Sequence, residues 1–399
     1  MPGFTPDTAQ TLGGHEWLVA RRVAAAERLA AITWPSTGEE IWRYSRVDDF
    51  DLDRYQPRRA EQRSLSVPDL DPGLVAKGVV VGDLADHDDP DAADWFGTCS
   101  DASPDAFTLL HDAFVAGGAY VRVPPGVVVD EPLFFEHRVG GDGLASFPHT
   151  LLVVGEGAEV SVVDRFAAHG TPHLCDTVIE LLVGDGARVR YVSVQEHGPD
   201  TWQIGLQRAH VGRDASLHSS AVALGGDYAR MRTESFLEGQ GGESDLLAVY
   251  FGDGNQVLDF RTLQDHVAPH TRSDLLFKGA VEDQAQSVYS GLVHLRESAQ
   301  HARASQTNRN LVLTEGASAE SIPNLEIEAN DVHCSHASAV GPIDDDQRYY
   351  LETRGIPPEE AERLIVLGFF DDVLNRLPVA TLAAALRHTI EHKVSRLRG

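Results

Sequence analysis

Hydrophobic and polar positions follow different periods along the chain, and each period predicts a different kind of structure. Within residues 7–31, small and aliphatic side chains recur at spacings of three and four, which predicts a helix with Asp7 as its N-cap and Pro35 beyond its end. Residues 105–117 return to this helical pattern and end at a glycine pair. Between them, residues 56–104 are rich in Pro, Asp and Arg, which favours a loop-rich connector with a few short elements.

From about residue 119 the pattern becomes that of short β-strands separated by a repeated corner. The corner reads Gly155-Glu-Gly-Ala158, then Gly184-Asp-Gly-Ala187, then Gly212-Arg-Asp-Ala215, so successive first glycines are 29 and 28 residues apart. Strands that repeat with such corners and without helices between them are typical of stacked coils, each burying its apolar side chains against the next. We therefore predict a parallel β-helix. A β-sandwich is the alternative, although sandwiches seldom repeat one corner at a near-constant spacing.

After residue 344 the helical period returns. A first segment begins with acidic residues and ends at Gly355, a second begins at Pro357-Pro358, and a last helix is expected over residues 379–397. The second segment is predicted to carry one apolar stripe made of Ala361, Leu364, Ile365, Gly368 and Phe369.

The periods divide the chain into a helical and loop-rich region at 1–104, a β-helix core at 105–343 and a helical domain at 344–399. The 399 residues include 61 acidic and 33 basic residues, for a formal charge of −28. Such a field repels nucleic acid, and no run of Lys or Arg offers a local exception. No secretion signal is recognisable, and no apolar run reaches the roughly 18 residues of a membrane helix. We expect a cytoplasmic protein that binds neither nucleic acid nor membrane.

Candidate chemistry is concentrated in residues 324–344, NLEIEANDVHCSHASAVGPID. If this run continues as a strand, Cys334 and His336 share one face and His333 lies on the other. A thiolate and a neutral imidazole suit iron or a nascent iron–sulfur cluster, but two ligands are too few for a closed site, so a second subunit would have to complete it. The structural alternative is a buried Cys that acts as a small apolar residue beside a hydrogen-bonded His. Glu326 and Glu328 alternate with apolar residues and are expected to face solvent.

The same run carries a resemblance to a known family. LEIEANDVHCSHASAVGPIDDDQRYYLETRGI, followed by AERLIVLGFFDDVL, resembles the C-terminal signature of the SufB/SufD family of SUF iron–sulfur cluster assembly proteins, and its D-V-x-C-S-H segment is the form of the SufD branch. GEEIWRYS at 38–45 and segments at 109–135 and 309–327 are similar to further parts of the family. The likeness covers residues 35–375. His333 stands where the family commonly has Lys, which leaves open whether His333 adds a ligand.

The resemblance implies a right-handed parallel β-helix flanked by N-terminal and C-terminal helices. It implies a non-catalytic scaffold subunit that pairs with SufB through the β-helix and docks the ATPase SufC through the C-terminal helices, while a cysteine desulfurase and its sulfur-transfer partner act indirectly. His336, with Cys334 as a second candidate, would meet a SufB cysteine at the interface. Iron or an iron–sulfur cluster would be held transiently, with no permanently bound cofactor. The expected ATPase-docking residues are Arg354, Gly355, Ile356, Gly368 and Phe369.

Other interpretations remain at this point. No phosphate-binding GxxxxGK[ST] motif occurs, so ATP hydrolysis is expected in the partner. The main alternative function is that of a β-helix polysaccharide lyase or hydrolase, whose carboxylates act on the outer face of the coils. A third is a metal-free structural homo-oligomer, and pairing as a homodimer is also open. Cys99 and Cys175 are expected to be structural.

Overall fold

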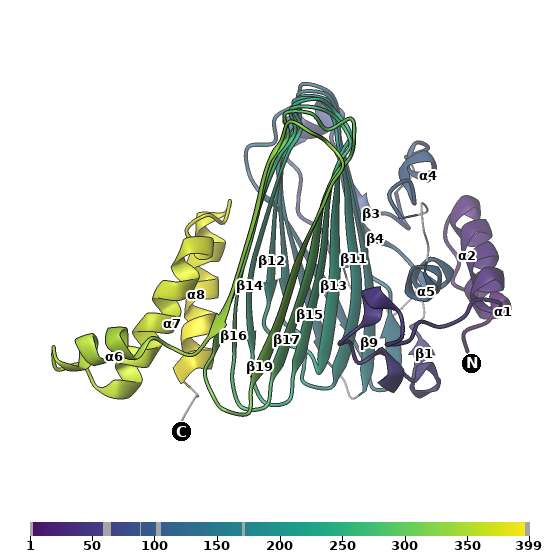
Figure 1. The fold of residues 1–399 in the computed structure, drawn as a ribbon. Helices are drawn as coiled ribbons and strands as arrows, with labels where there is room; N and C mark the ends of the chain where they lie inside the picture. Colours follow the sequence, from purple (N-terminus) through teal and green to yellow (C-terminus); the bar gives the residue numbers. More distant parts are fainter. Residues whose placement is uncertain (1–2, 59–64, 88, 101–104, 170–171, 396–399) are drawn as a thin grey trace.

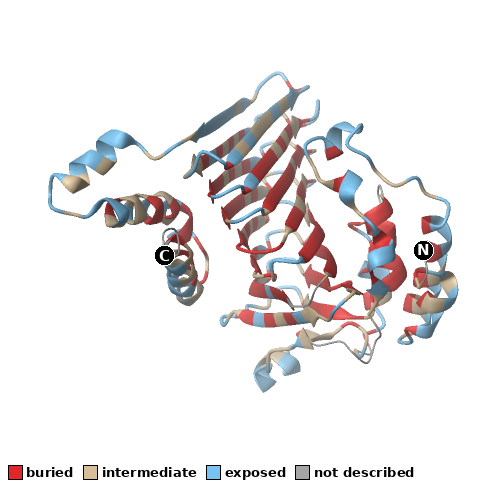
Figure 2. Ribbon diagram, turned by 90° about the horizontal axis from the view of Figure 1, so that it is seen from below, coloured by how far each residue is buried: buried red, intermediate tan, exposed pale blue. Residues whose placement is uncertain are grey.

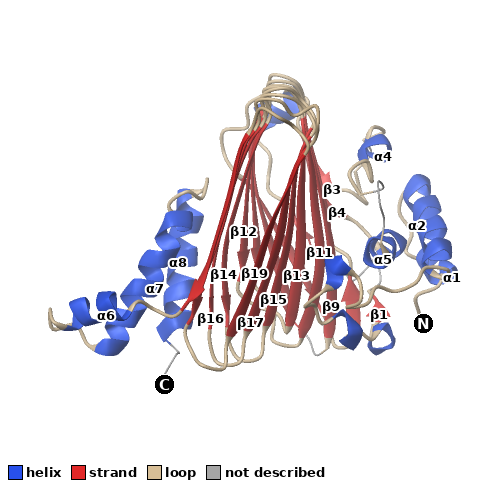
Figure 3. Ribbon diagram, in the orientation of Figure 1, coloured by secondary structure: helices blue, strands red, loops and turns tan. Residues whose placement is uncertain are grey.

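The computed structural model describes residues 3–58, 65–87, 89–100, 105–169 and 172–395. Two long sheets face each other, and helices lie outside them near both ends of the chain (Figure 1). Figure 3 shows the strands gathered in the middle of the molecule, between two groups of helices. The predicted β-helix with helical segments at both ends is confirmed.

Successive strands alternate between the two sheets along most of the β-helix, and within each sheet neighbouring strands are parallel except at the N-terminal ends. The first sheet consists, in spatial order, of β3 (Val80–Asp83), β4 (Gly118–Val123), β7 (His149–Val154), β9 (His173–Val183), β11 (Thr201–Val211), β13 (Tyr228–Leu237), β15 (Val257–His266), β17 (Gln286–Leu295) and β19 (Ser318–Ile327), with β1 (Gln56–Pro57) and β6 (Leu144–Ser146) beside it. The second sheet consists of β2 (Leu65–Ser66), β5 (Leu133–Gly140), β8 (Glu159–His169), β10 (Arg188–Gln195), β12 (Ser216–Ala223), β14 (Glu243–Gly252), β16 (Arg272–Val281), β18 (Arg303–Val312) and β20 (His333–Gly341).

The repeated G-x-x-A corner turns the chain from one sheet to the other. At two of the corners, the amide of Ala158 or Ala187 donates to the carbonyl of the corner's first glycine at 3.1 and 3.0 Å. Both alanines are fully buried, because a larger side chain would not fit between stacked turns. Gly157 and Gly186 each have a φ of +63°, a backbone conformation that glycine adopts without strain.

The N-terminal region differs from the predicted single helix. Two helices, α1 (Pro6–Thr11) and α2 (Glu16–Leu29), are separated at Gly13 and Gly14, whose φ angles of +68° and +91° end the first helix. The N-cap is Thr5, whose hydroxyl accepts from the Thr8 amide, so the expectation of Asp7 in that role is wrong. The remaining elements of the region are η1 (Glu40–Trp42), η2 (Val47–Asp49), η3 (Leu52–Arg54), α3 (Pro72–Ala76), α4 (Ala92–Trp95) and α5 (Ala106–Phe114).

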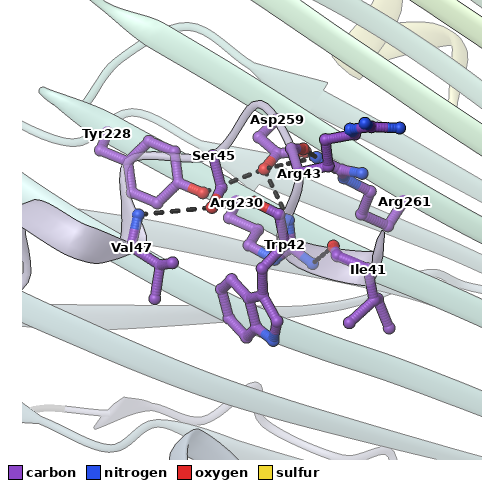
Figure 4. A network of polar contacts seen from close by, with 9 residues as sticks. All are labelled: Ile41, Trp42, Arg43, Ser45, Val47, Tyr228, Arg230, Asp259 and Arg261. Carbon is purple, nitrogen blue, oxygen red and sulfur yellow. Dashed lines mark hydrogen bonds and ion pairs between the residues drawn. The ribbon is translucent and has the colours of Figure 1, made fainter. Parts of the chain in front are cut away.

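The GEEIWRYS segment is held against the outer face of the first sheet by a buried ionic network (Figure 4). Asp259 accepts from the guanidinium groups of Arg230 and Arg261, each at 2.6 Å, and its side chain is fully buried. The same two arginines donate to the carbonyls of Ile41 at 2.7 Å and Arg43 at 2.6 Å. The Arg230 guanidinium also lies 4.0 Å from the centre of the Trp42 ring. This segment therefore has a structural role.

The C-terminal helices are α6 (Asp345–Glu352), α7 (Pro358–Leu374) and α8 (Ala380–Ser395), and α7 packs on β14 and β16. The predicted apolar stripe of α7 is wrong in part, since Leu364 and Gly368 are exposed. The stripe is displaced because the outer face of the second sheet is apolar, and it packs against the side of α7 that carries Val366, Leu367 and Phe370. The residues that α7 buries are Ala361, Val366, Leu367, Phe370, Val373 and Leu374.

Within the described part of the chain, the search for membrane-spanning helices found none of sufficient length and apolar character.

Candidate functional site

The last coil of the β-helix is open. β19 ends the first sheet and β20 ends the second, so each strand has a hydrogen-bonded neighbour on only one side among the described strands. Along β20 every residue is exposed or half-buried, in contrast to the buried strands before it (Figure 2). Unpaired strand edges of this kind are templates for a further strand. The site predicted from the sequence lies on this edge.

The strand register determines where the candidate side chains point. Cys334 pairs with Ala304 of β18, and His336 pairs with Gln306. Ala304 and Gln306 are buried between the two sheets, and parallel neighbours at one register position face the same side. Cys334 and His336 therefore face the open end of the interior, as the predicted alternation required.

Cys334 is half-buried and contacts an apolar cluster. The cluster consists of Val293, Leu295, Ala299, Ala302 and Ala304, with Leu325 and Val332 packed against it. This burial raises the pKa of the Cys334 thiol above its ordinary value of 9.0. In the isolated chain the thiol is protonated at neutral pH, so a metal would have to displace the proton on binding.

His336 is exposed at the edge and lies beside a buried polar network. Its neighbour Gln306 donates to the hydroxyl of Tyr289 at 2.6 Å, and that hydroxyl is 3.1 Å from the hydroxyl of Thr262. Further along β20, the Ser338 hydroxyl is 2.7 Å from that of Ser321 on β19, which joins the two edge strands. The result is an accessible imidazole on the edge strand, two residues from a thiol on the same face.

His333 is on the opposite face of β20. It continues a ladder of basic residues along the outer face of the second sheet, because Arg272, Arg303 and His333 occupy the same position on three successive strands. These residues line an open depression together with Ser305 and Ser335. His333 therefore does not share a strand face with Cys334 and His336, although His333 and Cys334 both border the depression. The sequence pattern did not reveal the ladder, because its members are about 30 residues apart.

Of the five predicted docking residues, Gly368 and Phe369 lie on α7, and Arg354, Gly355 and Ile356 lie in the turn between α6 and α7. Arg354 donates to the Tyr350 hydroxyl at 2.9 Å, Gly355 has a φ of +83° where α6 ends, and Ile356 is half-buried. Gly368 is exposed, and a Cβ atom there would meet nothing within 4 Å. Phe369 is half-buried and packs against the apolar cluster between α7 and the second sheet.

Phe369 is held by the buried Lys278 of β16. The ammonium group of Lys278 donates to the carbonyl of Phe369 at 2.8 Å, lies 4.6 Å from the centre of its ring and pairs with Asp372 at 2.5 Å. Lys278 also lowers the pKa of the Asp372 carboxyl. Phe369 therefore helps to attach α7 to the sheet, a role that helical periodicity alone did not distinguish from partner binding.

Comparison with known proteins identifies the family to which this chain belongs. The family model described as "SUF system FeS cluster assembly, SufBD core domain" matches residues 137–369, which include both edge strands and most of α7. An iron–sulfur cluster assembly SufBD family protein of Mycobacterium bovis is 34% identical over 369 residues, covering 90% of this chain and 89% of that protein. The iron–sulfur cluster assembly protein SufD of Bacillus subtilis is 32% identical over 290 residues, covering 72% of this chain and 66% of that protein. The chain belongs to the SufBD family of iron–sulfur cluster assembly proteins and is similar to SufD within it.

Proposed function

We propose that this protein is the SufD-type scaffold subunit of a SUF complex and has no catalytic activity of its own. The observation that carries the proposal is the open last coil, in which the edge strand β20 presents Cys334 and His336 at the mouth of the β-helix. The edge of SufB's β-helix would add to this one by main-chain pairing, which supplies affinity without a large apolar patch.

The ligand set on this chain is half of a site. A thiol and an imidazole on one face suit iron or a nascent cluster, and both are exposed or half-buried at the open edge of the β-helix. A SufB cysteine would complete the coordination of an iron–sulfur cluster that passes through the complex as cargo. His336 is the stronger ligand candidate, because its imidazole is accessible, whereas the thiol of Cys334 must first lose its proton.

The C-terminal helices would receive the SufC ATPase. One side of α7 is attached to the second sheet, while Arg354, Gly355 and Gly368 remain exposed. A partner bound on that exposed side could transmit its own conformational change to the β-helix through α7. ATP hydrolysis in SufC would then bias the arrangement of the SufB–SufD pair. Membership of the SufBD family disfavours the polysaccharide lyase or hydrolase alternative.

The test is co-expression of this chain with its SufB and SufC, followed by cluster reconstitution with a cysteine desulfurase and its sulfur-transfer partner. We expect the three subunits to elute together and His336→Ala to abolish most cluster formation while the complex persists. His333→Ala is the matched control, since it removes an imidazole from the other face of the same strand. Equal output from both variants would contradict the role of His336. Elution of this chain only as a homodimer would contradict the SufB pairing.

A further inference from the structure

A second group of ligand-type side chains lies on the outer face of the first sheet. Asp265 of β15, His294 of β17 and Glu326 of β19 occupy the same register position on three successive strands. Glu328 follows directly after β19. Neighbouring strands are about 4.8 Å apart, so the coil stacks these side chains into one column. The two chain neighbours of His294 are Val293 and Leu295, and both are buried in the interior. Because side chains alternate along a strand, His294 and the column point outward.

The imidazole of His294 lies between two carboxylates. Its Nδ1 is 3.4 Å from Oδ1 of Asp265, and its Nε2 is 3.6 Å from Oε1 of Glu328. Asp265 is itself buried and held by Arg296 through contacts of 2.9 and 2.6 Å. A fixed carboxylate behind one ring nitrogen orients the other nitrogen outward, which is how proteins commonly position a metal-bound histidine.

The carboxylates of Glu326 and Glu328 lie close to this imidazole. One ligand atom each from His294, Glu326 and Glu328 lies within 4.8 Å of the others. Three carboxylates and the guanidinium of Arg296 give this group a net charge of −2 when His294 is neutral, which matches a divalent cation. Both glutamates are exposed and free to adjust, while the less exposed His294 supplies the fixed point. One imidazole with two carboxylates suits Fe²⁺, Mn²⁺, Co²⁺ or Zn²⁺ better than Ca²⁺ or Mg²⁺.

We propose that His294, Glu326 and Glu328 form a divalent transition-metal site on the outer face of the last two coils. Asp265 is the positioning residue of the site. The site contains no sulfur ligand, so it would hold a single ion rather than a cluster. It is separate from Cys334 and His336, which face the interior from the other sheet. It is complete on this chain, whereas the proposed cluster site requires a partner.

The test uses the full-length chain alone and Mn²⁺ as the probe, followed by electron paramagnetic resonance and by calorimetry. We expect one saturable Mn²⁺ site with nitrogen hyperfine coupling from the imidazole. His294→Gln should remove the nitrogen coupling and weaken binding at least tenfold. Asp265→Asn should weaken binding by about 10- to 100-fold, as loss of an orienting carboxylate does elsewhere.

One control variant makes the result specific. Glu320→Gln removes another exposed carboxylate from β19 and should leave Mn²⁺ affinity unchanged. Absence of saturable binding by the unmodified chain, or binding that His294→Gln does not alter, would overturn the proposal. Because SufB is absent, the outcome is independent of the proposed pairing.

Discussion

Replacement of Gly368 separates the stability of the C-terminal helices from their binding function. Gly368 lies inside α7 and is exposed, and a Cβ atom at this position would meet nothing within 4 Å. Glycine in a helix interior is disfavoured against alanine by about 0.8–1 kcal/mol, because its backbone loses more conformational freedom on folding. Since no contact opposes the added methyl group, Gly368→Ala should stabilise α7 by about that amount.

The assay is native-state amide hydrogen exchange along α7. A stabilisation of about 0.9 kcal/mol corresponds to about fivefold slower exchange for amides that exchange through opening of this helix. Glu359→Ala is the control, because it changes an exposed residue of the first turn of the same helix; loss of the favourable carboxylate there should leave exchange unchanged or slightly faster. Unchanged or faster exchange in Gly368→Ala would refute the claim that an added methyl group at this position stabilises α7.

The binding half of the prediction uses a larger side chain. Gly368→Leu should also preserve the fold of the isolated chain, because Gly368 is exposed and leucine is a good helix former. If a SufC surface approaches the backbone closely at this glycine, the leucine should weaken SufC binding at least tenfold in calorimetry. Undiminished SufC affinity together with an intact α7 would remove Gly368 from the proposed docking face.

Three further predictions concern the β-helix and its contacts. Asp259→Ala leaves the guanidinium groups of Arg230 and Arg261 buried without their carboxylate, so urea unfolding should show that the free energy of unfolding falls by about 3–5 kcal/mol. A fall of less than about 1 kcal/mol would contradict the structural role of the network. Phe370→Ala creates a cavity between α7 and the second sheet and should cost about 3–5 kcal/mol, measured as faster hydrogen exchange in α7 but not in the central strands. Burial raises the pKa of Glu282 from 4.5 to about 8, so the folded state retains a proton that the unfolded chain releases; the unfolding free energy should therefore fall as pH rises from about 4.5 to 8. Urea titrations of Glu282→Gln across this range should show a flatter dependence than the unmodified chain, and equal slopes would contradict the assignment.

Local sequence patterns were sufficient to predict the architecture and to assign Cys334 and His336 to one face of their strand. The G-x-x-A corners repeat because each turn of the coil meets the same steric requirement, so their spacing reveals the coil directly. Alternation along a strand has a period of two, so Cys334 and His336 could be assigned to one face before the structure was known. Two ligands are too few for a closed site, and the family resemblance names SufB as the expected second subunit.

The sequence by itself therefore determined the β-helix, its helical ends and the shared face of Cys334 and His336, because each leaves a period or a repeated corner in the order of residues along the chain. Only the tertiary structure decided which side of α7 is buried, since the apolar outer face of the second sheet makes that choice. It alone brought together Asp265, His294 and Glu326, which are 29 and 32 residues apart. The spacings of 29 and 32 residues differ because the corners between the strands differ in length. The register across three strands is therefore a property of the folded coil rather than of any local pattern.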